Sequence, residues 1–153
     1  MILNTKTLKV LLIGGTGTIS MPICEKLAID PSIDLYVLNR GHKALPTGAT
    51  QIICDFNDTE QLQDVLKHYS FDIVCNFIIY KPQQAIQQIE LFRGKIQQYI
   101  FISTVATYNH ETAICIDETQ EQNNIYSQYG QDKTKCEQLF FKAYQQFGFP
   151  ITI

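Results

Sequence analysis

The chain has 153 residues, 45% of them hydrophobic and 18% charged, so it can bury one core and shows no sign of disorder. Its net charge is −3 at pH 7 and its charged residues are interspersed, which argues against nucleic acid as a partner. The apolar run 10–13 before the first glycine is too short for a signal peptide or a membrane span. We therefore expect one soluble, cytoplasmic domain with no membrane partner.

Strand-length apolar runs alternate with helix-length segments along the chain. In chain order, the sequence predicts strand 8–13, helix 19–29, strand 35–38, strand 51–54, helix 59–69, strand 73–76, helix 82–94, strand 99–103 and helix 127–147. The strands are apolar almost throughout, as a parallel sheet covered on both faces requires. The pattern predicts an α/β fold with a parallel sheet between helices.

Two further segments have no place in this alternation. Residues 106–125 show no periodicity, and loops of this length in compact domains are usually functional or mobile, so we expect substrate to enter there. Residues 149–153 read as a sixth strand inside which the chain stops, so we expect a truncated protein or one domain of a longer protein. An incomplete sixth strand predicts a homodimer formed through the sheet edge or through helices 82–94 and 127–147.

A glycine-rich turn joins the first predicted strand to the first predicted helix. Gly15-x-Gly17-x-x-Ser20 follows the strand at once, and this context is typical of a dinucleotide-binding loop. Glycines let the backbone approach a pyrophosphate, which the free N–H groups of the helix N-terminus stabilise. Ser20 is small enough for close packing of helix on strand. The residues predicted to contact the cofactor here are Gly14, Gly15, Thr16, Gly17, Thr18 and Ile19.

The end of the second predicted strand bears on which cofactor binds. An acid at this position binds the ribose 2′-hydroxyl of NAD, whereas this chain presents Asn39 and Arg40. Arg40 suits a 2′-phosphate as a charge-assisted partner, so we expect NADP in preference to NAD. A solvated surface charge is the alternative interpretation of Arg40.

Tyr129 and Lys133 lie four residues apart in the last predicted helix, so both side chains project from one face. A phenol with a pKa of about 10 is a poor base at neutral pH, and an adjacent ammonium group favours the phenolate. We expect Tyr129 to act as a general acid/base that Lys133 tunes. Gly130 lowers helix propensity between them, which is consistent with close approach by another group. Thr104, directly after the fifth predicted strand, is expected to position a substrate hydroxyl or carbonyl beside the phenolate.

The glycine motif, Ser103-Thr104 after the fifth strand and the Tyr129-x-x-x-Lys133 helix together resemble the extended short-chain dehydrogenase/reductase family, in its NAD-dependent epimerase/dehydratase branch. The resemblance covers the whole chain. It implies a three-layer, doubly wound Rossmann-type domain over residues 1–153 that binds NAD(P). It also implies that the C-terminal portion, which supplies most of the substrate pocket in this family, is absent.

The resemblance also implies roles for the residues of the reactive group. Tyr129 moves a proton, Lys133 also holds the nicotinamide ribose, and a hydride passes to or from the nicotinamide. Thr104 or Ser103 orients the substrate, and Ser103 also lies against the cofactor.

Three further positions match cofactor-lining residues of the family. Asp55 and Phe56, after the third strand, match positions beside the adenine, and Asn76, after the fourth, matches a residue that lines the cofactor. The bulky residues 77–79 depart from the small residues that the family often has there.

The expected function is that of an oxidoreductase, epimerase or dehydratase acting on a nucleotide sugar or another small hydroxyl or carbonyl compound. Two alternatives to this function stay open. One is a non-catalytic NADP-binding sensor or scaffold, and the other is an inactive N-terminal fragment of the enzyme. No metal is expected, because His42, His68 and His110 lack ligand-like spacing.

Overall fold

A computed structural model describes residues 7–111 and 115–153 of the chain. Residues 1–6 of the predicted domain and 112–114 of the predicted loop lie outside the described residues. The elements in chain order are β1 (Leu8–Ile13), α1 (Ser20–Ala28), β2 (Ile33–Asn39), β3 (Ala49–Ile53), α2 (Thr59–Leu66), β4 (Ile73–Asn76), α3 (Pro82–Phe92), β5 (Gln98–Phe101), the 3₁₀ turn η1 (Val105–Thr107), α4 (Gln128–Phe147) and β6 (Ile151–Thr152). Every predicted strand and helix is present, with bounds that shift by a few residues.

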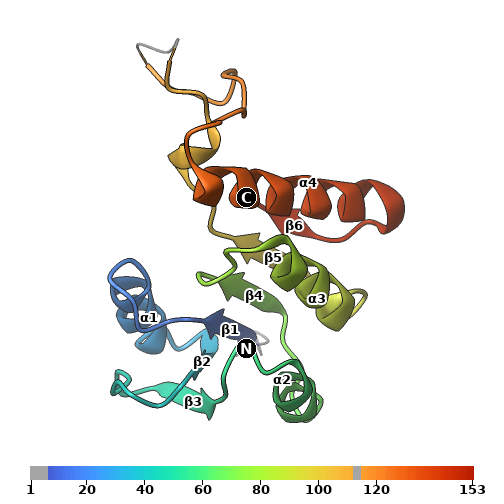
Figure 1. The fold of residues 1–153 in the computed structure, drawn as a ribbon. Coiled ribbons are helices and arrows are strands. Elements are labelled where there is room, and N and C mark those ends of the chain that lie inside the picture. The colour runs from blue at the N-terminus through green and yellow to red at the C-terminus, as the bar shows by residue number, and fades with distance from the viewer. Residues whose placement is uncertain (1–6, 112–114) are drawn as a thin grey trace, which may run out of the picture.

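The strands form one six-stranded parallel sheet of order β3-β2-β1-β4-β5-β6. Helix α1 covers one face over β1 and β2, while α2, α3 and α4 cover the other (Figure 1). Each face has its own apolar cluster: Cys24 of α1 packs with Leu12 and Val37, and Phe140 of α4 packs with Phe101 and Tyr99. The predicted three-layer α/β fold is confirmed.

Local sequence signals set where the helices begin and end. The Asp58 carboxylate accepts a hydrogen bond from the Gln61 N–H and so caps α2, and Pro82 starts α3, where its missing N–H removes no helical bond. The Ser127 hydroxyl accepts from the Gly130 N–H at 3.0 Å and caps α4. Gly148 ends α4 with a positive φ of 67°, a conformation that favours glycine.

Because all the strands are parallel, their carboxyl ends meet at one edge of the sheet. That edge carries the glycine loop after β1 and the segments that follow β2, β3, β4 and β5. Helix α1 and helix α3 lie on opposite faces of neighbouring strands β1 and β4, so a crevice opens there, which is where ligands bind in open α/β sheets. The described residues between η1 and α4, 108–111 and 115–127, lie away from the sheet beyond the start of α4 (Figure 1).

None of the helices in the described part of the chain is long and apolar enough to span a membrane.

Candidate functional site

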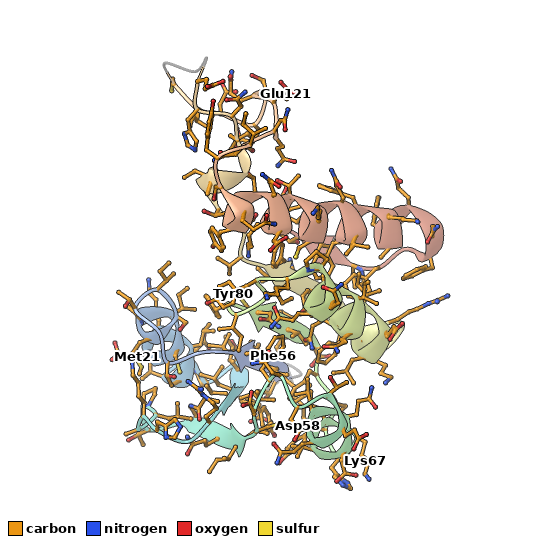
Figure 2. All side chains as sticks on the ribbon, in the orientation of Figure 1. Met21, Phe56, Asp58, Lys67, Tyr80 and Glu121 are labelled. Carbon is orange, nitrogen blue, oxygen red and sulfur yellow. The ribbon has the colours of Figure 1, made fainter. Side chains whose placement is uncertain are left out.

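A cavity of about 450 Å³ opens at the carboxyl edge, between the glycine loop and the segments after β2, β3 and β4. Its lining includes seven of the residues predicted to bind cofactor: Gly14, Thr16, Gly17, Asn39, Arg40, Asp55 and Phe56. Ile78, Tyr80 and Gln84 close it on the α3 side, and Figure 2 labels Tyr80 and Phe56. Residues that lie far apart in the sequence are thus brought to one cavity.

The three glycines of the loop are required for different structural reasons. Gly14 has φ +82°, and a Cβ there would lie 2.6 Å from the Ile78 side chain. The bulk of Ile78 after β4 is thus accommodated by the missing side chain of Gly14. Gly15 is buried against Val37, whereas a Cβ on Gly17 would meet only the Ser20 hydroxyl oxygen, at 3.4 Å. Gly17 therefore leaves open space on the cavity side of the loop.

Asn39 carries the clearest sign of a missing partner. Its side-chain oxygen accepts from the Gly41 N–H at 2.8 Å and from the Gln51 amide at 2.9 Å. Its amide nitrogen Nδ2 is buried and has no hydrogen-bond partner within the described structure. Leaving such a donor unpaired costs about 1–3 kcal/mol, so an acceptor on a bound ligand would complete the site.

Three cationic or titratable side chains line the cavity on the β2 side: Arg40, His42 and Lys43. The Lys43 ammonium donates to the Thr16 carbonyl at 3.0 Å and so joins this segment to the glycine loop. The sequence analysis singled out Arg40 alone. The spacing of three such residues within four positions was the signal that could have identified the other two.

Asp55, Phe56 and Asn76 have different surroundings. Asp55 is exposed, and its carboxylate accepts from the Asn57 N–H at 2.9 Å. Phe56 is buried in the core, and the small exposed part of the residue lines the cavity. Asn76 is 0% exposed and does not line the cavity.

Asn76 belongs to a buried polar network instead. Its amide donates to Gln88 and to the Tyr99 hydroxyl at 3.3 and 3.1 Å, and its oxygen accepts from the Ile78 N–H at 2.9 Å. This network fixes the segment after β4, which in turn lines the cavity.

Tyr129 and Lys133 project from the first turns of α4 toward the same end of the sheet, but their surroundings differ. Tyr129 is 44% exposed, and its ring centroid lies 6.3 Å from that of Tyr80, within the range of aromatic pairs. Tyr80 therefore connects the cavity to Tyr129. Thr18 and Ile19, at the start of α1, are exposed beside the cavity rather than in its lining.

Lys133 is only 1% exposed. Its ammonium donates to the carbonyls of Ile79 and Ile102 at 3.0 and 2.5 Å and lies 3.9 Å from the centre of the Phe101 ring. Burial lowers the pKa of Lys133 from 10.5 to about 8, although Cys136 and Glu137 raise it. Lys133 therefore ties the ends of β4 and β5 together in this structure, and one of its three N–H groups has no hydrogen-bond partner among the described residues.

The Ser103-Thr104 pair follows β5 by two residues. The Thr104 hydroxyl oxygen accepts from the Ala106 N–H at 3.2 Å, and its O–H group donates to no acceptor within residues 7–111 and 115–153. The Ser103 hydroxyl donates to the carboxylate of Glu137, a residue of α4 that is 5% exposed. The same carboxylate accepts from the Gln122 amide at 2.6 Å. The sequence analysis missed Glu137, because nothing in its local pattern distinguishes it from a solvated helix glutamate.

Gly130 is where η1 meets α4. A Cβ on Gly130 would lie 2.0 Å from the Ala106 carbonyl oxygen, so only glycine lets the two segments approach this closely. The predicted close approach at Gly130 is confirmed. The Asn124 amide donates to the same carbonyl at 2.9 Å and fixes the base of the loop.

Among the described residues, no three His, Cys, Asp or Glu side chains come together as metal ligands.

The strand order, the helices on both faces and the glycine loop at the crevice define a Rossmann-type α/β protein. A sequence profile of the NAD-dependent epimerase/dehydratase family matches residues 10–153, and the chain belongs to this family. No curated protein sequence matches the chain.

Solved structures of sugar-nucleotide epimerases share the fold. The UDP-Glc/GlcNAc 4-epimerase of Campylobacter jejuni is 20% identical, with a TM-score of 0.78 over 90% of this chain and 49% of its own. The UDP-glucuronic acid 4-epimerase of Bacillus cereus, in complex with UDP-glucuronic acid and NAD, is 19% identical, with a TM-score of 0.76 over 95% of this chain and 55% of its own. The UDP-glucose 4-epimerase of Bifidobacterium longum, in complex with NAD⁺ and UDP, is 17% identical, with a TM-score of 0.78 over 94% and 51%. The chain thus spans about half the length of these proteins.

Proposed function

We propose that the cavity at the carboxyl edge binds NADP or NAD, with the adenosine end between the segments after β2 and β3. The observation that carries this proposal is Asn39, which lines the cavity bounded by the glycine loop and whose amide nitrogen has no hydrogen-bond partner among the described residues. A ribose hydroxyl or a phosphate oxygen is an acceptor that suits this donor. The open side of Gly17 and the exposed residues Thr18 and Ile19, just before α1, offer room and N–H groups for a pyrophosphate.

NADP is the preferred cofactor in this proposal. Arg40 and Lys43 give the β2 side of the cavity an excess of positive charge, and the position that would hold an acid for the 2′-hydroxyl of NAD is Asn39. A 2′-phosphate would accept charge-assisted hydrogen bonds from Arg40. Asp55, on the β3 side, is the only carboxylate that lines the cavity in the described structure.

We further propose that the chain carries the proton-transfer group of an epimerase, dehydratase or reductase. When bound, nicotinamide supplies a hydride acceptor or donor. Tyr129 would hold and release a proton at its phenol oxygen, and Thr104 would donate its free O–H to a substrate oxygen. Lys133 would offer its remaining N–H toward the cofactor ribose. The substrate class we propose is a nucleotide sugar, because the solved relatives include enzymes of UDP-sugars.

A cofactor-binding module without turnover is the second candidate. The burial of Lys133 and its two bonds to backbone carbonyls favour it, because they hold the ammonium in the core. Turnover requires that Lys133 reach the bound cofactor with its remaining N–H group from this buried position.

Calorimetric titration with NADP and with NAD tests the binding proposal. We expect NADP to bind more tightly, and Arg40→Ala to weaken NADP binding by about 10- to 100-fold while changing NAD binding much less. Arg93→Ala is the matched control, because Arg93 is the other arginine and stacks on Phe147 outside the cavity. Binding of neither cofactor by the wild-type chain would overturn the proposal.

Turnover is tested by incubating the chain with NADP or NAD and UDP-glucose and analysing the sugar products by NMR spectroscopy. If the chain is an enzyme, the wild-type chain should form sugar products that Tyr129→Phe does not form. Cofactor binding without products in any condition supports the second candidate.

A further inference from the structure

We propose that Ser20 is a positioning residue that holds the glycine loop in its binding shape and removes the Gly17 N–H from phosphate recognition. This inference rests on the proposed cofactor site and concerns how that site is built. A third glycine or alanine at this position would allow close packing of α1 on the sheet but could form no such bonds.

The evidence is a pair of side-chain hydrogen bonds across the loop. The Ser20 hydroxyl donates to the Gly14 carbonyl at 2.8 Å and accepts from the Gly17 N–H at 2.8 Å. Ser20 is 1% exposed and is the first residue of α1, so its own position is fixed by the helix. The Met21 N–H donates to the Gly17 carbonyl at 2.9 Å, which closes the turn on the backbone side.

A hydroxyl is the group that can do this, because it carries one donor and two acceptor sites. The loop contains three glycines, which lose more conformational entropy on ordering than other residues. A loop already ordered by Ser20 does not have to be ordered by the cofactor, and such preorganisation increases affinity. Ser20 thus acts on cofactor binding through the loop rather than by contact.

The same bond changes which N–H groups face a phosphate. The Gly17 N–H points to the Ser20 hydroxyl, so it is not free for a ligand. Thr18 and Ile19 are exposed and precede the first residue of α1, where helices leave N–H groups without intrahelical partners. We therefore assign the phosphate contacts to the N–H groups of Thr18 and Ile19, and not to that of Gly17.

Calorimetry on Ser20→Ala and Ser20→Gly tests the positioning role. Both variants should bind NADP and NAD about tenfold more weakly than the wild-type chain, because each loses two hydrogen bonds that order the loop. Ser32→Ala is the matched control: Ser32 follows α1, and its hydroxyl also makes a side-chain hydrogen bond, to Asp30, but it lies outside the cavity. Thermal unfolding is measured in parallel, since a residue with a merely structural role would lower stability without changing the affinity of the folded chain.

Amide NMR spectra of the wild-type chain test the second part and do not depend on a variant that folds. On titration with NADP, the amide signals of Thr18 and Ile19 should shift most, and the hydrogen exchange of the Gly17 amide should stay slow with and without cofactor. Wild-type affinity in folded Ser20→Ala, or a Gly17 amide that shifts more than its two neighbours, would overturn this inference alone. Failure of the wild-type chain to bind either cofactor would overturn the proposed function with it.

Discussion

Lys133 has a structural role in the fold and a proposed role in the site. Its ammonium is bound by two strand-end carbonyls and faces an aromatic ring, yet burial still lowers its pKa from 10.5 to about 8. A group with a pKa near 8 exchanges protons near neutral pH far more readily than an exposed lysine does. The proposed role of Lys133 beside Tyr129 rests on this buried ammonium group.

The stability of the chain should depend on the ionisation of Lys133. Folded Lys133 loses its proton near pH 8 and an unfolded lysine near pH 10.5, so the unfolded state binds more protons in this window and stability rises with pH. We expect the free energy of unfolding, relative to that of Lys133→Met, to rise by up to about 3 kcal/mol from pH 8 to 10.5. Urea unfolding of both proteins measures it, and a constant difference would contradict the burial of the charge.

Replacing Gly130 with alanine should destabilise the chain, although this substitution inside a helix usually stabilises. Alanine in place of glycine inside a helix normally stabilises by about 1 kcal/mol. Here the added Cβ would lie 2.0 Å from the Ala106 carbonyl oxygen, so η1 and α4 would have to separate. We expect Gly130→Ala to destabilise the chain by about 1–3 kcal/mol in urea unfolding. Gln138→Ala, at an exposed position of the same helix, is the control and should change stability little.

Among the elements, α4 organises the carboxyl end of β5 and the base of the loop. Glu137 accepts hydrogen bonds from Ser103 after β5 and from Gln122 in the loop. The Ala106 carbonyl packs closely against Gly130, which has no side chain. These contacts hold Thr104 and Tyr129 on two elements that are locked to each other. Such contacts would keep the two side chains at a fixed separation if they act together, as we propose.

Glu137→Gln should weaken this arrangement while preserving the shape of the side chain. The neutral amide can accept from only one of the two donors and turns its own NH₂ toward the other. We expect a loss of about 1 kcal/mol of stability, because one part-buried, charge-assisted hydrogen bond is lost. Glu90→Gln, at an exposed position of α3, is the control for the loss of a negative charge. Equal unfolding midpoints for Glu137→Gln and the wild-type chain would rule out a structural role for the carboxylate.

The pattern of the sequence was sufficient for the elements but not for the contacts between them. The apolar runs predicted all six strands, most clearly the central strands β1 and β4, because a strand buried on both faces has few polar positions to obscure it. The glycine spacing and the Asn39-Arg40 pair also predicted residues that line the cavity, because both motifs directly follow predicted strands. Glu137 and the inward turn of Asn76 could not be predicted, because each depends on partners from distant segments.

At the scale of the whole molecule, α3 and α4 lie side by side on the outer surface of the sheet (Figure 1). They expose apolar side chains there, among them Ile86, Phe141 and Tyr144. We predict that the chain self-associates through these helices, as the sequence analysis expected. Sedimentation velocity over a range of concentrations should show a dimer that Phe141→Asp disrupts and Ile29→Asp, at an exposed apolar position beside α1, does not. A strictly monomeric wild-type chain at every concentration would contradict this prediction.

We propose that the carboxyl-edge cavity holds the cofactor, and a second cavity of the same molecule serves as the control. A second cavity of about 510 Å³ lies between the ends of α2 and α3 and is lined by Leu66, Phe71 and Lys95 among others. Hydrogen-exchange mass spectrometry with and without NADP distinguishes the two. We predict protection in peptides covering residues 14–20, 39–43 and 54–57, and none in those covering 66–71 and 90–96. Protection confined to the second cavity, or no protection anywhere, would contradict cofactor binding at the carboxyl edge.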